Sequence, residues 1–295
     1  MKSINMDRDL IPCTPNELII RENFKKDYKL SCPLLMDQDS FYKSLIIWEL
    51  VDDWKIYLNM SHKYPDFDAY RKSVRNDIVK TIEAVPGFNE LTEDLIKTQN
   101  PYYGTFEGPR SYLMNENCNK RLISIDLIRG NYQSLKYLGS KYVLDTETYE
   151  ELVGKFTKEP SLIESKYFRQ MIFGLLKPDI HAIIQKMMLS HVISEIMKIK
   201  EYKLIHLTND EVAFVIESDD ELDNIRKVIN TMPYQLRISE FSIYRIPNGH
   251  HEQWFLRYDK YTENGQVIIK RRLMSIHVRF LFQVYNWIEK LPNGK

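Results

Sequence analysis

The sequence predicts an α+β fold, in which a mainly helical N-terminal region precedes an antiparallel sheet with helices on one of its faces. Three observations support this class. Apolar residues recur at helical spacing through much of the N-terminal third. Two tight hairpins are indicated in the second half, around Thr208–Glu211 and around Asn264–Gly265. Helices first, and a mixture of helices and strands afterwards, is an element order typical of α+β proteins.

The length and the charge balance limit the kinds of partner. The chain has 295 residues, enough for one large domain or two smaller ones, and its hydrophobic content of 43% is that of a packed globule. Its 41 basic and 41 acidic residues cancel, so no overall field draws the chain towards nucleic acid or an acidic membrane. A site for a polyanion therefore has to be local.

The cysteines and the apolar segments bear on the compartment. Cys13, Cys32 and Cys118 are far apart and odd in number, so they predict neither a disulfide framework nor a CxxC zinc site. The reducing cytoplasm is the simplest interpretation. We expect no signal peptide, because the first residues contain acids and prolines, and no membrane partner, because no apolar run is long enough to span a bilayer.

The elements of the N-terminal region are predicted from turn residues and apolar stripes. Residues 1–38 contain several prolines and short extended segments such as ELIIREN, which favour an irregular arm with one hairpin. Asp39-Ser40 offer an N-cap for a long helix over 41–60, and a second helix over 66–85 ends at a Pro-Gly pair. The apolar stripes of both helices indicate core packing.

The second half begins after residues 100–120, whose glycine, proline and asparagine content predicts a linker or mobile loop. A short apolar strand, RLISID, follows over 121–126. Helical segments are expected over 142–156 and over 165–200, the second with a break near Pro178. After the first hairpin the expected elements are a helix capped by Asp219 or Asp220 over 219–232, strands over 234–246, 252–261 and 266–273, and a final helix over 275–291.

Three acids lie at strand ends in the second half. Asp126 ends the strand RLISID, and Asp210 and Glu211 occupy the tip of the hairpin LIHLTNDEVAFVIES. A hairpin needs only turn-forming residues at its tip, whereas two Mg²⁺ ions in a phosphoryl-transfer site need carboxylates from different strands. Two interpretations stay open: a shared metal site, or the acids that ordinarily end strands and form turns.

The hairpin resembles motif C of the family A DNA polymerases. That motif is usually written His-Asp-Glu followed by apolar residues and a Glu. Here the segment NDEVAFVIE has Asn209 in place of the His, while Asp210, Glu211 and Glu217 match. Upstream, SIDLIRGNYQSLKYL is similar to motif A of that family, a strand with a metal-binding Asp that continues into a helix. Asp126 matches that Asp, and Asn131 stands at the position of the Glu beside the incoming sugar.

A third segment, KYFRQMIFGLL, resembles the fingers helix of the same family, which carries a cation four residues before an aromatic-Gly pair. Arg169, Phe173 and Gly174 match this spacing, and the first two share one face of a helix. The family's later Tyr is absent. The resemblance implies that Arg169 grips the triphosphate and that Phe173 stacks on the base. It also places Lys166 and Asn131 beside the nucleotide.

The resemblance extends over about residues 120–246 and implies two domains. A palm-like α+β domain is expected over 119–295, with a short fingers segment at 160–203. The mainly helical region 1–118 is expected to precede it, with two helices that act as a reduced thumb.

The activity that the resemblance implies is template- or primer-dependent nucleotidyl transfer by a polymerase-like enzyme of viral or mobile-element type. Asp126, Asp210 and Glu211 are the expected catalytic residues and metal ligands, holding two Mg²⁺ ions or Mn²⁺ in their place. Nucleoside triphosphates and nucleic acid are the expected partners. The alternative is a non-catalytic, palm-derived subunit that binds nucleic acid or a partner within a replication or transcription complex.

Cations near these motifs give a candidate nucleic-acid surface. Interleaved with tyrosines, they are suited to contact phosphates and stacked bases. The alternative, given equal weight at a neutral net charge, is a solvated surface of salt bridges. The residues expected to contact nucleic acid are Arg110, Arg121, Arg129 and Lys177.

Overall fold

The chain divides into two units, Met1–Arg71 together with Ser275–Lys295, and Lys72–Met274. The computed structural model describes residues 15–28, 30, 37–47, 50–99, 102, 106–246, 253–263, 266–275 and 280. The boundary predicted between residues 118 and 119 falls inside the second unit. The α+β class with a helical N-terminal region is confirmed, because the antiparallel sheet belongs to the second unit and follows a series of helices.

Aromatic packing joins the helices of the first unit. The helices are α1 (Pro15–Tyr28), α2 (Gln38–Ile47), α3 (Val51–Lys63) and the first turn of α4 (Phe67–Glu83). Phe24 of α1 is fully buried, with its ring centroid 5.2 Å from that of Trp54 of α3, and the indole also meets Phe41 of α2 at 4.9 Å. Arg71 of α4 forms an ion pair with Asp27 of α1 at 2.7 Å, which connects the first and the last of these helices.

Two expectations for this region are wrong. Residues 15–28 form a helix instead of part of an irregular arm. The apolar run in ELIIREN fits a strand or a helix, and the pairing of Arg21 with Glu17 one turn earlier, at 2.6 Å, favours the helix. The single helix predicted over 41–60 is divided between α2 and α3, whereas the helix predicted over 66–85 is confirmed as α4.

Six strands of the described chain form one antiparallel sheet in the second unit. Their order across the sheet is β2-β3-β1-β4-β5-β6, and every neighbouring pair is antiparallel. Both predicted hairpins are confirmed, as β2–β3 and as β5–β6. The strands are β1 (Leu122–Leu127), β2 (Leu204–Leu207), β3 (Glu211–Val215), β4 (Leu236–Ile246), β5 (Trp254–Glu263) and β6 (Gln266–Met274).

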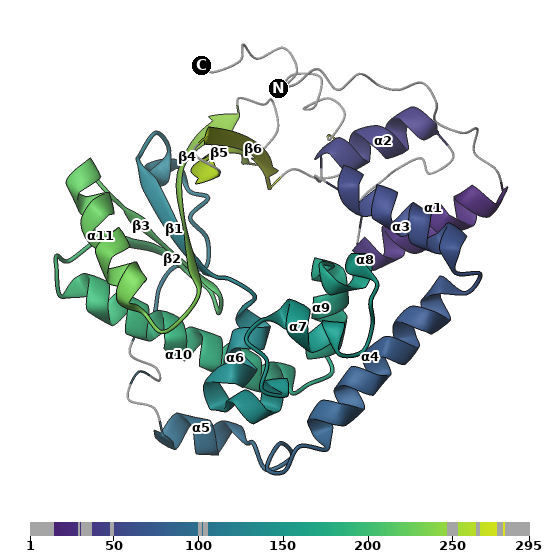
Figure 1. Ribbon diagram of the computed structural model, residues 1–295. Helices are drawn as coiled ribbons and strands as arrows, with labels where there is room; N and C mark the ends of the chain where they lie inside the picture. Colours follow the sequence, from purple (N-terminus) through teal and green to yellow (C-terminus); the bar gives the residue numbers. More distant parts are fainter. Residues whose placement is uncertain are drawn as a thin grey trace. The chain divides into compact units, whose positions relative to one another are not determined.

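The connections between the strands follow the split β-α-β pattern. The chain runs β1, α10, β2, β3, α11, β4, and the four strands lie in the order β2-β3-β1-β4. Figure 1 shows α10 and α11 beside this sheet. The short helices α6–α9 are inserted between β1 and α10. The helices of this unit after α4 are α5 (Glu93–Gln99), α6 (Gly130–Leu138), α7 (Tyr149–Gly154), α8 (Pro160–Ile163), α9 (Lys166–Phe173), α10 (Pro178–Met197) and α11 (Asp219–Thr231).

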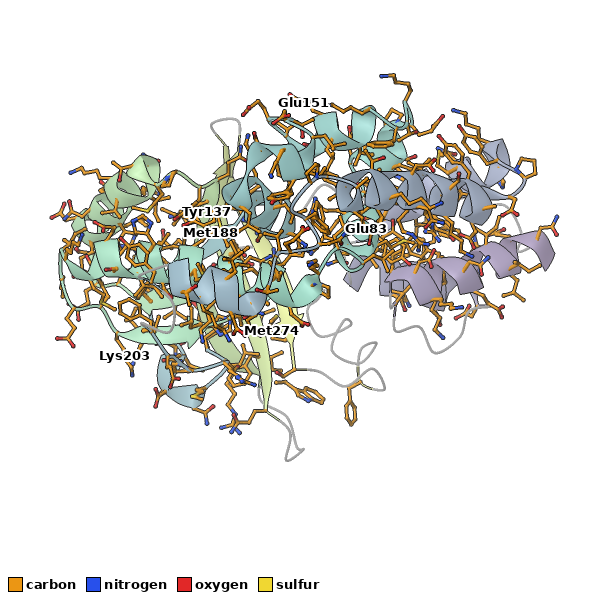
Figure 2. All side chains as sticks on the ribbon, turned by 90° about the horizontal axis from the view of Figure 1, so that it is seen from below. Glu83, Tyr137, Glu151, Met188, Lys203 and Met274 are labelled. Carbon is orange, nitrogen blue, oxygen red and sulfur yellow. The ribbon has the colours of Figure 1, made fainter. Side chains whose placement is uncertain are left out.

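The two faces of the sheet differ in their side chains. On β1, Ile123 and Ile125 point to one face and are fully buried, while Ser124 and Asp126 point to the other because side chains alternate along a strand. On the face of Ser124, an apolar cluster that includes Phe241 packs against Tyr112 of the segment before β1. Figure 2 shows side chains of the helical layer, with Tyr137 of α6 and Met188 of α10 labelled; these two helices contact each other.

Several boundaries in the second unit differ from the predictions. The helix predicted over 142–156 is a 3-10 turn (Ser140–Val143) followed by α7, because two left-handed residues interrupt it and Thr148 caps a new helix. The break predicted near Pro178 is confirmed, since Lys177 is left-handed and α10 starts at the proline. The segment 106–120 is no simple linker, because Tyr112 is buried in it.

Two further predictions concern the end of the chain. The strand over 234–246 and the helix over 219–232 are confirmed as β4 and α11, but the N-cap of α11 is Ser218, not Asp219 or Asp220. The final helix predicted over 275–291 lies outside the described residues, apart from Ser275 and Phe280.

None of the described helices combines the length and the apolar character that a membrane crossing demands.

Candidate functional site

The pairing of β1 with β3 brings the three predicted acids to one end of the sheet. Asp126 lies directly opposite Glu211 in the antiparallel register, so their side chains point to the same face. The backbone N–H of Leu127 donates to the carbonyl of Asp210 at 3.0 Å, which places the hairpin tip beside the end of β1. Asp126, Asp210 and Glu211 are called the acidic edge below.

The hairpin tip is closed by Thr208. Its backbone N–H donates to the carbonyl of Glu211 at 2.9 Å, and its hydroxyl oxygen accepts from the N–H of Glu211 at 3.1 Å. The same hydroxyl lies 3.3 Å from Oδ1 of Asp210. Asn209 and Asp210 are exposed at the tip, while Glu211 is half-buried, so the two adjacent acids have different surroundings.

An arginine on the next strand contacts Asp126. Arg237 of β4 is the register partner of Asp126 across the β1–β4 pair, and its Nη2 lies 3.0 Å from Oδ2 of the carboxylate. Because the Arg237 side chain is 61% exposed, the pair is accessible to solvent, and another cation can replace the arginine at little cost.

Glu211 faces a different set of partners. Nη1 of Arg257, on β5, lies 3.5 Å from its Oε1, and Nε2 of the buried His206, on β2, lies 3.7 Å from its Oε2. The sequence interpretation missed both residues. The signal was present, because each is a polar residue within an apolar strand, LIHL and WFLRYD, but only the register shows that they share the face of Glu211.

Arg257 belongs to a buried polar network. Its Nε donates to Asp259 at 2.7 Å, its Nη2 donates to the hydroxyl of Ser124 on β1 at 3.2 Å, and its Nη1 also donates to the hydroxyl of Tyr112. The guanidinium carbon lies 3.9 Å from the ring centroid of Phe241 on β4. Arg257 is only 5% exposed, so its charge is balanced inside the protein.

The surroundings change the ionisation of the groups at this face. Burial raises the pKa of Glu211, and the nearby carboxylate of Asp126 raises it further, against the opposing effect of Arg257. Burial lowers the pKa of His206, and the positive charge of Arg257 acts in the same direction. The site therefore combines an imidazole whose charged form is disfavoured with carboxylates that repel one another, and a cation placed between those carboxylates relieves the repulsion.

The inserted helices carry a basic cluster, which consists of Arg129 and Arg169. Arg129, at the start of α6, pairs with Glu150 of α7. Arg169 of α9 lies over the ring of Tyr149, 5.5 Å from its centroid. Burial lowers the pKa of Arg169, and Arg129 adds to this effect, while Tyr149 and Glu150 oppose it. Two guanidinium groups thus lie near one carboxylate, which leaves local positive charge.

The predicted base-stacking role of Phe173 does not fit this structure. The side chain is 1% exposed and packs in the core, with ring centroids 6.2 Å from Tyr149 and 5.5 Å from His181. The apolar side of α9 faces inward. Phe173 is therefore a core residue, although its sequence spacing puts it on the same helix face as Arg169. Lys166 is exposed at the start of α9. Asn131 accepts a hydrogen bond from Gln185 of α10.

Most of the cations predicted to contact nucleic acid also have partners within the protein. Arg121 pairs with Asp219 at 2.6 Å and with Glu240 at 2.7 Å. Lys177 donates to two backbone carbonyls, of Asn89 and Leu91, each at 2.8 Å. Their charges are therefore engaged within the protein. Of the predicted set, Arg129 is paired as described above, and Arg110 is exposed.

The acidic edge offers oxygen donors to a divalent cation. Within the described ranges, no group of three or more His, Cys, Asp and Glu side chains is already arranged to hold a metal ion. The chemistry of the donors nevertheless suits Mg²⁺ or Mn²⁺, because the acidic edge presents carboxylate oxygens from a strand and from an adjacent hairpin tip.

Comparison of the chain with protein-family models, with curated proteins and with solved structures finds no match.

Proposed function

We propose that this protein is a polymerase-type nucleotidyltransferase, which joins nucleotides to the end of a nucleic acid. The observation that carries the proposal is the position of Asp126, on the first strand of a split β-α-β sheet, opposite Glu211 and next to Asp210. Carboxylates that lie close together can hold the metal ions of two-metal phosphoryl transfer.

In this proposal Asp126 and Asp210 hold the divalent cations, Mg²⁺ or Mn²⁺, with Glu211 beside them. The bound ions supply charge stabilisation for the attacking and leaving oxygens. The chain itself provides two acids of unlike exposure, because Asp210 is open to solvent while Glu211 is half-buried. Arg237 has to leave Asp126 when a cation binds, and its exposure makes this exchange inexpensive.

The basic cluster of α6, α7 and α9 supports a nucleoside triphosphate as the substrate. Arg129 and Arg169 lie near a single carboxylate, Glu150, so phosphate oxygens gain a net attraction there. Arg129 comes two residues after the last residue of β1, which connects the cluster to the acidic edge along the chain. Asn131 is positioned by Gln185 and is the proposed neighbour of the sugar.

Primer extension tests the proposal. Labelled primers on DNA and RNA templates are incubated with the full chain, dNTPs or NTPs, and Mg²⁺ or Mn²⁺. We expect extension by the wild-type chain and none by Asp126→Asn or Asp210→Asn. Asp223→Asn is the matched control, because Asp223 is an exposed acid that pairs with Arg226 on α11. Absence of extension and of nucleotide binding in every combination would contradict the proposal.

A non-catalytic, palm-derived subunit is the second candidate. It is favoured by the arginines that already pair with two acids of the acidic edge, Arg237 with Asp126 and Arg257 with Glu211. Such a chain binds nucleic acid, or a partner in a replication or transcription complex, without a metal. Gel-shift measurements with single-stranded and primed nucleic acid, made with and without Mg²⁺, distinguish the two. Metal-independent binding without any primer extension supports the subunit.

A further inference from the structure

We propose that Arg257 is a positioning residue, whose guanidinium fixes the carboxylate of Glu211 and thereby holds the β2–β3 hairpin tip beside Asp126. The inference rests on the proposed function only in one respect, that the tip is used to bind a divalent cation. The anchoring itself is a property of the metal-free protein, so the two are tested separately.

The reach of the Arg257 side chain is the first argument. In the sheet order β3-β1-β4-β5, Arg257 on β5 and Glu211 on β3 are separated by two strands. The side chain passes over β4, where its guanidinium lies 3.9 Å from the centroid of the Phe241 ring, and donates to Ser124 on β1. Its Nη1 then lies 3.5 Å from Oε1 of Glu211. One side chain thus connects four neighbouring strands.

The rigidity of the guanidinium is the second argument. Asp259 is 2% exposed and accepts from Nε of Arg257 at 2.7 Å, while Tyr112 accepts from Nη1. A planar guanidinium fixed at both ends has little freedom left, so its contact with Glu211 has a defined direction. By contrast, Asp126 is paired with an arginine whose side chain is 61% exposed.

The hairpin tip needs such an anchor. Its closing contacts come from the hydroxyl and the backbone of Thr208. Among the described contacts outside the β1–β3 ladder, only the bond from the N–H of Leu127 to the carbonyl of Asp210 joins the backbone of the tip to β1. Groups that hold a metal-ligating carboxylate in place commonly change metal affinity by about 10- to 100-fold when they are replaced.

The experiment compares Arg257→Lys with Arg272→Lys in the full chain. Lysine keeps the charge of Arg257 but cannot contact Asp259, Ser124 and Glu211 at once. Arg272 is the matched control, because its Nε lies 3.2 Å from Oδ2 of the same Asp259 and it is 43% exposed. Amide hydrogen exchange of the metal-free proteins is measured first. We expect exchange at Leu127 and Glu211 to become at least about tenfold faster in Arg257→Lys alone, since loss of the anchor opens the tip locally.

Calorimetric titration with Mn²⁺ then tests the use of the tip. We expect Arg257→Lys to weaken Mn²⁺ binding about 10- to 100-fold, and to cause no further loss in a Glu211→Gln background, because its effect passes through Glu211. Unchanged exchange at the tip, or equally faster exchange throughout α10, overturns the inference. Faster local exchange with no Mn²⁺ binding by any variant supports the anchor and contradicts the proposed function.

Discussion

Asp126 and Glu211 face each other across neighbouring antiparallel strands, and each is paired with an arginine from a different strand. Arg237 reaches Asp126 from the adjacent β4 and is mostly exposed, whereas Arg257 reaches Glu211 from β5 and is buried. The two pairs therefore differ in how easily another cation can replace the arginine.

Mg²⁺ or Mn²⁺ is expected to raise the melting temperature of the wild-type protein. A ligand that binds only the folded state stabilises it by about 2.7 kcal/mol at a concentration 100 times its Kd. Asp210→Asn should abolish this increase without altering the fold, because Asp210 is exposed at the tip. Thermal denaturation with and without metal measures the effect. No increase in the wild type, together with a more stable Asp210→Asn, favours the non-catalytic subunit.

Arg237→Gln is expected to strengthen binding of Mn²⁺. The wild-type metal site has to displace an ion pair of 3.0 Å, and exposed pairs of this kind are worth up to about 1 kcal/mol, or a two- to fivefold change in affinity. Calorimetric titration measures the change. Arg226→Gln, which removes an exposed arginine paired with Asp223 at 3.1 Å, serves as the control for net charge. Equal affinity in Arg237→Gln and Arg226→Gln would show that Arg237 does not compete with the metal.

Stability is expected to fall in mild acid because of His181. Burial lowers its pKa from 6.5 to about 4, and the residue is 3% exposed. Below pH 6.5 the unfolded chain takes up a proton that the folded chain refuses until about pH 4, so stability is lost as the pH falls through this interval. The loss is about 3 kcal/mol in total.

Urea denaturation between pH 7 and pH 4 measures this dependence. His181→Leu has no imidazole to protonate, and its free energy of unfolding should therefore vary less with pH over that interval. A variant with the same acid dependence as the wild type would assign the loss of stability to other groups.

Ser218→Ala is expected to destabilise the second unit by about 1 kcal/mol. The Ser218 side chain accepts from the N–H of Glu221 and is the N-cap of α11, and loss of such a cap typically has this cost. Asp220→Ala is the comparison, because that exposed acid makes no N-cap bond in α11 and should cost less. Chemical denaturation compares the two. A larger loss in Asp220→Ala would contradict the capping assignment.

The sequence by itself determined the α+β class, both hairpins and the break before α10, because these depend on local signals. Alternation of apolar residues, an Asn-Gly turn and a proline at the start of a helix act within a few residues of chain. It also identified Asp126, Asp210 and Glu211 as acids at strand ends. Local signals failed at α1, where an apolar run fitted two structures and side-chain pairing and packing decided between them.

Tertiary structure alone decided which groups surround those acids. Arg257 and His206 come from strands far from Glu211 in sequence, and only the register of the sheet places them on its face. Burial likewise separated Arg169, which retains contact with solvent, from Phe173, which is a core residue one turn away. Sequence spacing defines which residues share a helix face. Which part of that face remains accessible depends on contacts with segments distant in sequence, so it is decided by the packing of other elements.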